Sequence, residues 1–235
     1  MIKHIIKIVY LRIWKSIILK ANSNINSSVL NKGSKSNFKC KITNSTVSFT
    51  EINEGCVVQD TKTYGNVTLG RFVTITGPGT VIKALNNTIQ IGSFTSIGQN
   101  VCIVDFNHNI NKCSSAFLNH LVFNDTFVKD IVGQNIIIEE DVFIGSNTVI
   151  LPGVKIGRGS IIGAGSIVNI DIPRYSIAVG NPIKVKKKRF SDELINLLED
   201  LKWWHWDTEK LNSNKNIFNT DLTLLSTDEI ETLLK

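Results

Sequence analysis

The sequence predicts an all-β solenoid, a parallel β-helix of hexapeptide repeats that carries a protruding loop and has helices at its two ends. Three observations support this fold. Aliphatic residues recur every six positions through the second half of the chain. Glycine often follows them directly. The period also stops between Ile103 and Val132 and then resumes, which is typical of a loop thrown out of a regular scaffold.

The period is longest after the break. The downstream aliphatic row is Val132, Ile138, Ile144, Ile150, Ile156, Ile162 and Val168, and the upstream row is Leu85, Ile91, Ile97 and Ile103. Each hexapeptide is expected to be one short strand plus a corner, with the aliphatic side chain inward, so that three of them, about 18 residues, close one triangular coil. A β-sandwich is the alternative, but its strands recur every 8–12 residues or so with variable turns. We therefore expect a β-helix over residues 41–172, with a loop excursion at 104–131.

The excursion is the place where the sequence predicts chemistry. Long loops on rigid scaffolds tend to carry binding and catalytic residues, and this one begins with Asn107 and His108. A neutral imidazole can accept a proton near pH 7, so His108 is either a general base or a loop histidine held for structural reasons. Asp105 either orients that imidazole, contacts an acceptor, or is a solvated turn residue.

Composition limits the partners. The formal net charge is +6, but the cations fall in two runs, one near the N-terminus and one at 184–189, rather than on an aromatic-studded face. We therefore expect no nucleic-acid partner. The four cysteines show no CxxC spacing, so neither a metal site nor a disulfide framework is predicted, and a reducing cytosol suits them.

Both ends of the chain are expected to be helical. In residues 1–40 a basic apolar helix carries the stripe Ile2, Ile5, Ile6, Val9, Ile13 and Ile17. Charges interrupt it too often for a membrane span, so it either lies on an anionic membrane surface or caps the solenoid. We expect a cytoplasmic protein. If the helix lies on a membrane surface, the protein makes peripheral contact with the inner membrane.

The C-terminal extension, residues 173–235, is expected to contain a helix over 191–203. Ser191 is its predicted N-cap, and Asp192 and Glu193 occupy the first turn. Trp203, Trp204 and Trp206 are expected to pack this helix onto the coil or onto a neighbouring subunit, with carbohydrate stacking as the alternative.

Several segments together resemble a known family. The runs IGSFTSIGQNVCI (91–103) and IGSNTVILPGVKIGRGSIIGAGSIV (144–168), the Asn-His pair at the loop mouth and the exit segment AVGNPIK (178–184) resemble the hexapeptide-repeat acetyltransferases. The subfamily is the one shared by xenobiotic (streptogramin and chloramphenicol) acetyltransferases and capsule or lipopolysaccharide O-acetyltransferases. The likeness covers about residues 67–207. It implies a left-handed coil, whereas the general rule for parallel crossovers favours a right-handed one.

The resemblance also implies an activity and a set of site residues. It implies acetyl-CoA as co-substrate, no metal, His108 as catalytic base and a homotrimer with active sites between subunits. We assign the acceptor side to Asp105, Asn107, Phe117 and Phe143. The residues assigned to the coenzyme are Gly145, Ser146, Gly163, Ala164, Gly180, Pro182, Lys187 and Arg189. The small residues would leave a groove for the pantetheine arm, although corners need them anyway, and the cations would meet the phosphates.

Departures from the subfamily bear on the acceptor. Phe143 replaces a frequent Trp, Asn109 replaces the Arg of antibiotic-modifying members, and Ser114 to Phe117 replace a Ser-Thr-Tyr-Pro-Phe-like run. We therefore expect O-acetylation of a sugar hydroxyl in a capsule or O-antigen polysaccharide. The alternatives are O-acetylation of a streptogramin or chloramphenicol, N-acetylation of an amino sugar, and a non-catalytic β-helix scaffold or binding module.

Overall fold

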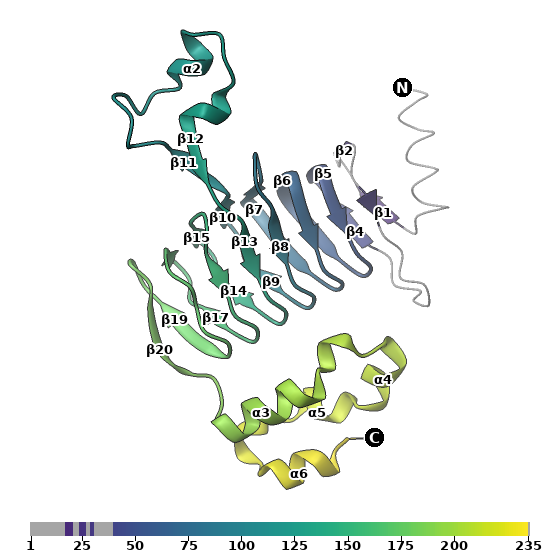
Figure 1. The fold of residues 1–235 in the computed structure, drawn as a ribbon. Helices are drawn as coiled ribbons and strands as arrows, with labels where there is room; N and C mark the ends of the chain where they lie inside the picture. The colour runs from purple at the N-terminus through teal and green to yellow at the C-terminus, as the bar shows by residue number, and fades with distance from the viewer. Residues whose placement is uncertain (1–16, 21–23, 27–28, 31–39, 235) are drawn as a thin grey trace. The chain divides into compact units, whose positions relative to one another are not determined.

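In a computed structural model of the chain, the predicted left-handed parallel β-helix is present, and the loop excursion projects from it (Figure 1). The structure describes residues 17–20, 24–26, 29–30 and 40–234. These residues divide into two compact units at Lys187 and Lys188, and each unit is considered by itself below.

Short strands make up the coils. Before the excursion they are β1 (Ile17–Lys20), β2 (Asn24–Asn26), β3 (Val29–Leu30), β4 (Cys40–Thr43), β5 (Thr46–Ile52), β6 (Val57–Leu69), β7 (Thr74–Lys83), β8 (Ile89–Ile91), β9 (Ser96–Ile97) and β10 (Cys102–Val104). After it they are β13 (Ile136–Ile138), β14 (Phe143–Ile144), β15 (Val149–Ile150), β16 (Lys155–Ile156), β17 (Ile161–Ile162), β18 (Ile167–Val168), β19 (Ser176–Val179) and β20 (Lys184–Lys188).

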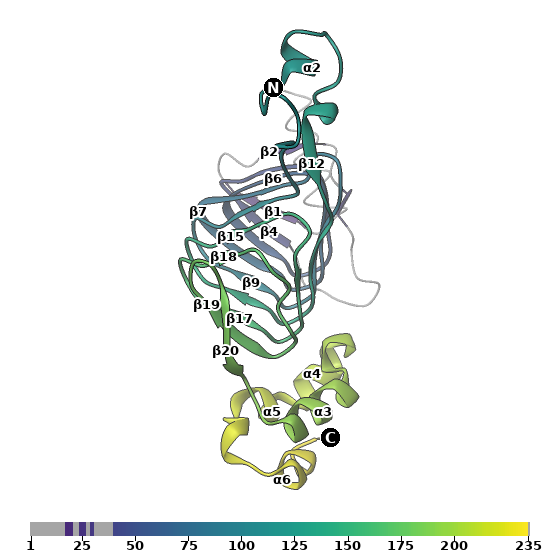
Figure 2. The same ribbon diagram turned by 60° about the vertical axis from the view of Figure 1, so that its left-hand side comes forward.

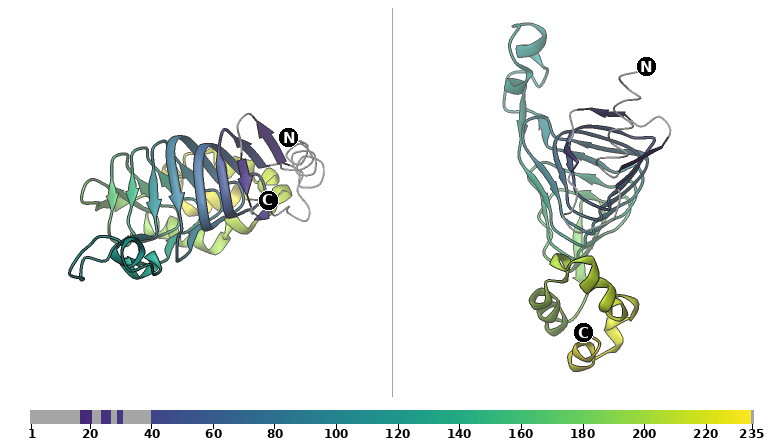
Figure 3. Two further views of the ribbon diagram at one scale, coloured as in Figure 1. Left: turned by 90° about the horizontal axis from the view of Figure 1, so that it is seen from above. Right: turned by 90° about the vertical axis from the view of Figure 1, so that its right-hand side faces the viewer.

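The strands stack in three parallel columns, one for each face of the coil (Figures 2 and 3). One column runs β8–β13–β16, the second β9–β14–β17–β19 and the third β10–β15–β18. In the register Ile144 lies beside Ile162, and Ile150 beside Val168. These pairings confirm the predicted coil of three hexapeptides.

The interior of the coil is the predicted aliphatic column. Ile144, Ile156, Ile162 and Val168 are all 0% exposed. The residues two positions before them are aliphatic or carry a small hydroxyl group, and they are also buried: Val142, Val154, Ser160 and Ser166. Burial of each Ile side chain contributes about 2–3 kcal/mol of transfer free energy, so the column stabilises the whole stack.

Two members of the predicted rows do not face inward. Val132 is 46% exposed because the strand that contains it belongs to the excursion rather than to the coil. Leu85 lies in a bend outside any strand and is only partly buried. The six-residue period is thus broken over a longer stretch than predicted, and the coil resumes at Ile136.

The ends of the predicted coil also differ. Strands lie beyond both predicted bounds of 41 and 172: β2 pairs in parallel with β5, and β19 continues the second column. The predicted N-terminal helix lies almost entirely outside the described residues; its last stripe residue, Ile17, is in strand β1, which pairs in parallel with β4. No helix among the described residues is long and apolar enough to cross a membrane.

The second unit is helical. It contains α3 (Asp192–Leu201), η2 (Trp203–His205), α4 (Thr208–Ser213), α5 (Lys215–Asn219), η3 (Leu222–Leu224) and α6 (Thr227–Thr232). The Ser191 hydroxyl accepts a hydrogen bond from the N–H of Leu194, which confirms the predicted cap. The ring of Trp203 lies edge-on to Phe218 at 5.2 Å between centroids. Trp203 therefore packs against another helix of its own unit.

An ion cluster joins three successive coils at one corner. The carboxylate of Glu139 accepts hydrogen bonds from Arg174 Nε at 2.7 Å and from the N–H of Arg158 at 3.0 Å, and Lys155 Nζ lies 3.0 Å away. Burial alone raises the pKa of this carboxyl, but the bonds from Arg174, Arg158 and Lys155 outweigh it and lower the pKa from 4.5 to about 2.

This cluster makes the stability of the β-helix depend on pH. Because the folded-state pKa is depressed, the stabilisation is fully present above pH 4.5 and is lost as the pH falls towards about 2. We expect Glu139→Gln to lower the free energy of unfolding by about 1 kcal/mol at pH 7, a value reduced by solvent screening, and by almost nothing near pH 2. Urea unfolding at several pH values measures this, with the exposed Glu193→Gln as control. An equal loss of unfolding free energy in Glu139→Gln at pH 7 and near pH 2 would contradict this pH dependence.

Candidate functional site

The excursion begins and ends as a two-stranded antiparallel ribbon. Strand β11 (Phe106–His108) pairs with β12 (Ile131–Gly133), so that His108 lies opposite Ile131 and Asn107 opposite Val132. Between them are the short helix α2 (Leu118–Leu121) and the 3-10 turn η1 (Phe127–Asp130). Figures 1 and 2 show this ribbon leaving the coil beyond β10. His108 is thus held by regular backbone pairing in an otherwise irregular loop.

Asp105 anchors the base of the ribbon. Its carboxylate is fully buried and accepts hydrogen bonds from the backbone N–H groups of Leu85 at 2.9 Å, Asn86 at 3.0 Å and Asn87 at 2.7 Å. The carbonyl of Asp105 also accepts the N–H of Gln134 at 3.1 Å. The carboxylate therefore faces the turn at 85–87 rather than the imidazole, and it is not a solvated turn residue. The structure gives it an anchoring role in place of the predicted contact with an acceptor.

A second side chain, in the segment between β12 and β13, also fixes the excursion to the coil. Asn135 Oδ1 accepts hydrogen bonds from the N–H of Thr88 at 2.9 Å and from its hydroxyl at 3.0 Å. A Cβ at Gly133 would approach the Asp105 carbonyl oxygen to 2.4 Å, so only glycine fits there. The two ends of the excursion are therefore fixed to the coil within a few residues of each other.

The imidazole of His108 is exposed and oriented by one backbone carbonyl. Its Nδ1 lies 2.6 Å from the carbonyl oxygen of Ser115, and its ring centroid is 4.3 Å from that of Phe117. A carbonyl oxygen only accepts hydrogen bonds, so Nδ1 carries the proton in the neutral ring and Nε2 has the free lone pair. This is the tautomer that a general base acting through Nε2 requires.

The predicted acceptor residues are only partly brought together. Phe117 stacks on His108, and Asn107, in the same strand, is exposed. Phe143 is 46% exposed on the outer side of β14, in the second column, whereas the excursion follows β10 in the third. Sequence reasoning missed Ser115, because its contribution is a backbone carbonyl and no side-chain pattern marks it.

The predicted coenzyme residues of the coil share one corner. A Cβ at Gly145 would approach the backbone N of Ala164 to 2.5 Å, and a Cβ at Gly163 would approach Val179 Cγ1 to 2.4 Å. The N–H of Gly165 donates to the carbonyl of Ser146 at 2.9 Å. Close stacking of the coils therefore requires glycine at both positions, where Gly145 is buried and Gly163 is half-buried.

The remaining coenzyme residues lie at the end of the coil and beyond it. Gly180 bonds to Ser166 Oγ through its N–H at 3.1 Å and has a φ of +111°, and a cis peptide bond precedes Pro182. Lys187 is in β20, all of whose residues are exposed. Arg189 belongs to the helical unit, with its guanidinium 4.8 Å from the ring centroid of Phe190.

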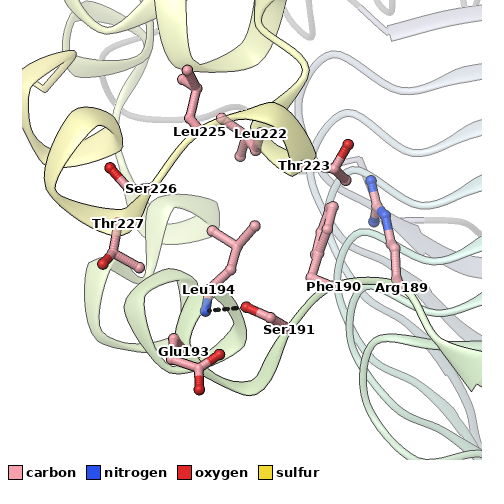
Figure 4. A pocket seen from close by; sticks show the side chains of 10 residues that line it. All are labelled: Arg189, Phe190, Ser191, Glu193, Leu194, Leu222, Thr223, Leu225, Ser226 and Thr227. Atoms are coloured by element: carbon pink, nitrogen blue, oxygen red, sulfur yellow. Dashed lines mark hydrogen bonds between the residues drawn. The ribbon is translucent and has the colours of Figure 1, made fainter.

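Arg189 lines a pocket of about 450 Å³ within the helical unit (Figure 4). Leu194, Leu222 and Leu225 supply apolar surface, and Thr223 and Ser226 supply hydroxyl groups. Among the described residues, no three His, Cys, Asp or Glu side chains converge as metal ligands.

The anchoring role of Asp105 is testable by removal of the carboxylate. We expect Asp105→Ala to lower the free energy of unfolding by about 3 kcal/mol, because three backbone N–H groups lose a buried, charged acceptor. Faster hydrogen exchange at the amides of residues 85–87 should accompany the loss. Asp125→Ala, at an exposed carboxylate of the same excursion, is the control and should cost far less. Unchanged exchange at 85–87 would refute the anchor.

Comparison with known proteins gives the same result for the coils. Residues 135–169 match the model of a family described as "Bacterial transferase hexapeptide (six repeats)". The chain is 40% identical over 134 residues to a chloramphenicol acetyltransferase of Klebsiella aerogenes, covering 52% of this chain and 61% of the relative. It is 33% identical over 147 residues to a galactoside O-acetyltransferase of Lactococcus lactis, covering 60% and 63%.

The matched segments therefore span less than two thirds of these relatives' lengths. Among solved structures, a galactoside acetyltransferase in complex with coenzyme A is 24% identical, with a TM-score of 0.44 over 72% of this chain and 67% of that one. Both the buried register from Ile138 to Val168 and the family match fall on the same coils. The coils of this chain resemble those of the bacterial hexapeptide-repeat transferases, whose family model matches residues 135–169.

Proposed function

We propose that the protein is an acetyl-CoA-dependent O-acetyltransferase in which His108 is the general base. The observation that carries the proposal is the hydrogen bond from His108 Nδ1 to the Ser115 carbonyl, which leaves the Nε2 lone pair available on an exposed ring. The names of the relatives, chloramphenicol and galactoside acetyltransferases, support acetyl transfer to a hydroxyl group.

The proposed reaction is direct transfer. Nε2 of His108 accepts the proton of the acceptor hydroxyl while the oxygen of that hydroxyl attacks the thioester carbonyl of acetyl-CoA. The tetrahedral intermediate then collapses, the C–S bond breaks, and the thiolate of coenzyme A takes the proton from the imidazolium. Phe117, whose ring centroid lies 4.3 Å from that of the imidazole at an interplanar angle of 32°, is proposed to limit the rotation of the imidazole.

The coenzyme is proposed to lie along the glycine corner of the coil. Gly163 is half-buried and Ala164 is exposed there, so this part of the corner presents small residues to solvent. Lys184, Lys186 and Lys187 are exposed on β20 and suit the phosphates. Following the family resemblance, we propose a cytoplasmic homotrimer, with Phe143 facing the acceptor across a subunit boundary and peripheral contact with the inner membrane through the N-terminal segment.

A sugar hydroxyl of a surface polysaccharide is the acceptor that we propose. It is supported by Asn109 and by the run Ser114 to Phe117, which depart from the antibiotic-modifying pattern. The second candidate is an antibiotic hydroxyl, favoured by the 40% identity to a chloramphenicol acetyltransferase. N-acetylation of an amino sugar remains a third alternative.

The catalytic role is tested by His108→Ala. We expect kcat to fall by about 10²–10⁴-fold, measured as release of free thiol from acetyl-CoA with chloramphenicol and with a panel of mono- and oligosaccharides as acceptors. His120→Ala, which removes another imidazole from the same excursion, is the matched control and should retain activity. Full activity in His108→Ala would refute the mechanism. Turnover of chloramphenicol but of no saccharide, with raised resistance in an expressing host, would favour the antibiotic.

Binding of coenzyme A separates the enzyme from a scaffold. We expect millimolar coenzyme A to raise the Tm, because a ligand that binds only the folded state stabilises it. Replacing Lys186 and Lys187 together by Gln should reduce that rise without changing the Tm of the free protein. No rise in Tm with coenzyme A would favour the non-catalytic binding module.

A further inference from the structure

Asp130 is a buried acid within the excursion. It is the last residue of η1 and is only 3% exposed, although most of the surrounding loop is exposed. Its carboxylate accepts hydrogen bonds from the side-chain amide of Asn119 and from the N–H of His120, the latter at 3.3 Å. Lys112 Nζ lies 3.8 Å from the same carboxylate.

These partners lie on both sides of Ser115 in the sequence. Lys112 comes three residues before it, and Asn119 four residues after it. The segment that supplies the carbonyl to His108 is therefore tied to one carboxylate at both of its ends.

The backbone of Asp130 is fixed to the strand that carries the imidazole. Its carbonyl accepts the N–H of Asn109 at 3.0 Å, and the next residue, Ile131, lies opposite His108 in the β11–β12 ribbon. Asp130 therefore has direct backbone contact with the His108 side of the site and side-chain contact with the Ser115 side.

The charge of Asp130 suits this arrangement. Burial raises the pKa of its carboxyl, but the bonds from Asn119 and His120 and the nearby ammonium of Lys112 lower it below its usual value. The group is thus an anion that accepts from all of its neighbours and donates to none.

We infer that Asp130 is a positioning residue for His108: its carboxylate holds the segment 112–120 so that the Ser115 carbonyl meets Nδ1 and fixes the imidazole as the Nδ1–H tautomer. The inference rests on the proposed role of His108 for its functional meaning. Its structural content, a carboxylate that sets the tautomer of a histidine without touching it, is independent of that role.

The tautomer is measured by ¹⁵N–¹H correlation spectra of the histidine rings at a pH where they are neutral, with His108→Ala to identify the His108 signals. In the unsubstituted protein we expect the Nδ1–H form. In Asp130→Ala we expect the population to move towards the Nε2–H form that free imidazole side chains favour. The kcat for acetyl transfer should fall about tenfold, less than on loss of the base itself, with the KM for acetyl-CoA unchanged.

Two further variants keep the test decisive. Asn119→Ala removes one tether and leaves the carboxylate in place, so it should fold and move the tautomer population in the same direction by a smaller amount, even if Asp130→Ala does not fold. Asp125→Ala, an exposed acid of the same excursion that bonds to Lys129, should leave the tautomer unchanged.

The outcomes distinguish the two proposals. An Nδ1–H ring that persists in both Asp130→Ala and Asn119→Ala overturns the positioning role, whatever the activity. A moved tautomer in a protein that transfers acetyl to no acceptor supports the positioning role and counts against the proposed function.

Discussion

Hydrogen bonding between stacked coils, closed over a column of aliphatic side chains, is the constraint on which every other feature depends. Ile144 lies over Ile162 and Ile150 over Val168, and each coil both donates to and accepts from its neighbours. Because the strands are only a few residues long, no coil is stable alone, and each gains its stability from those beside it. The backbones of neighbouring coils approach each other closely at the corners, and positions 145 and 163 are therefore glycine.

A solenoid of this kind is a poor source of catalytic geometry unless it is interrupted. The excursion leaves the coil at the corner between β10 of the third column and β13 of the first. Asp105 and Asn135 fix its two ends there by hydrogen bonds to the turn at 85–88, so the columns remain continuous. The antiparallel pairing of β11 and β12 then continues regular backbone structure from the coil as far as His108. The imidazole is thus rigidly based and still exposed, a combination that a proton-transferring group in an open cleft requires.

Much of the fold could be predicted from the sequence, since the inward position recurs at a fixed spacing from Ile138 to Val168. The same period was wrong at Val132 and at Leu85, because aliphatic spacing does not reveal whether a strand pairs with the coil or with the excursion. The prominence of His108 was predictable from its place at the loop mouth. The carbonyl of Ser115 was not, because a backbone group leaves no side-chain pattern in the sequence. The anchoring role of Asp105 was not, because it depends on contacts with a turn about one coil away in sequence.

In the proposed mechanism the excursion presents Nε2 of His108 to a thioester held against the coil. A crystal structure with coenzyme A bound tests this geometry. It should show the coenzyme along the corner of Gly145 and Gly163, with its sulfur near Nε2 of a His108, in the same subunit or a neighbouring one, at a separation of about 3–4 Å. A coenzyme bound in the helical unit, or with its sulfur far from every His108, would contradict it.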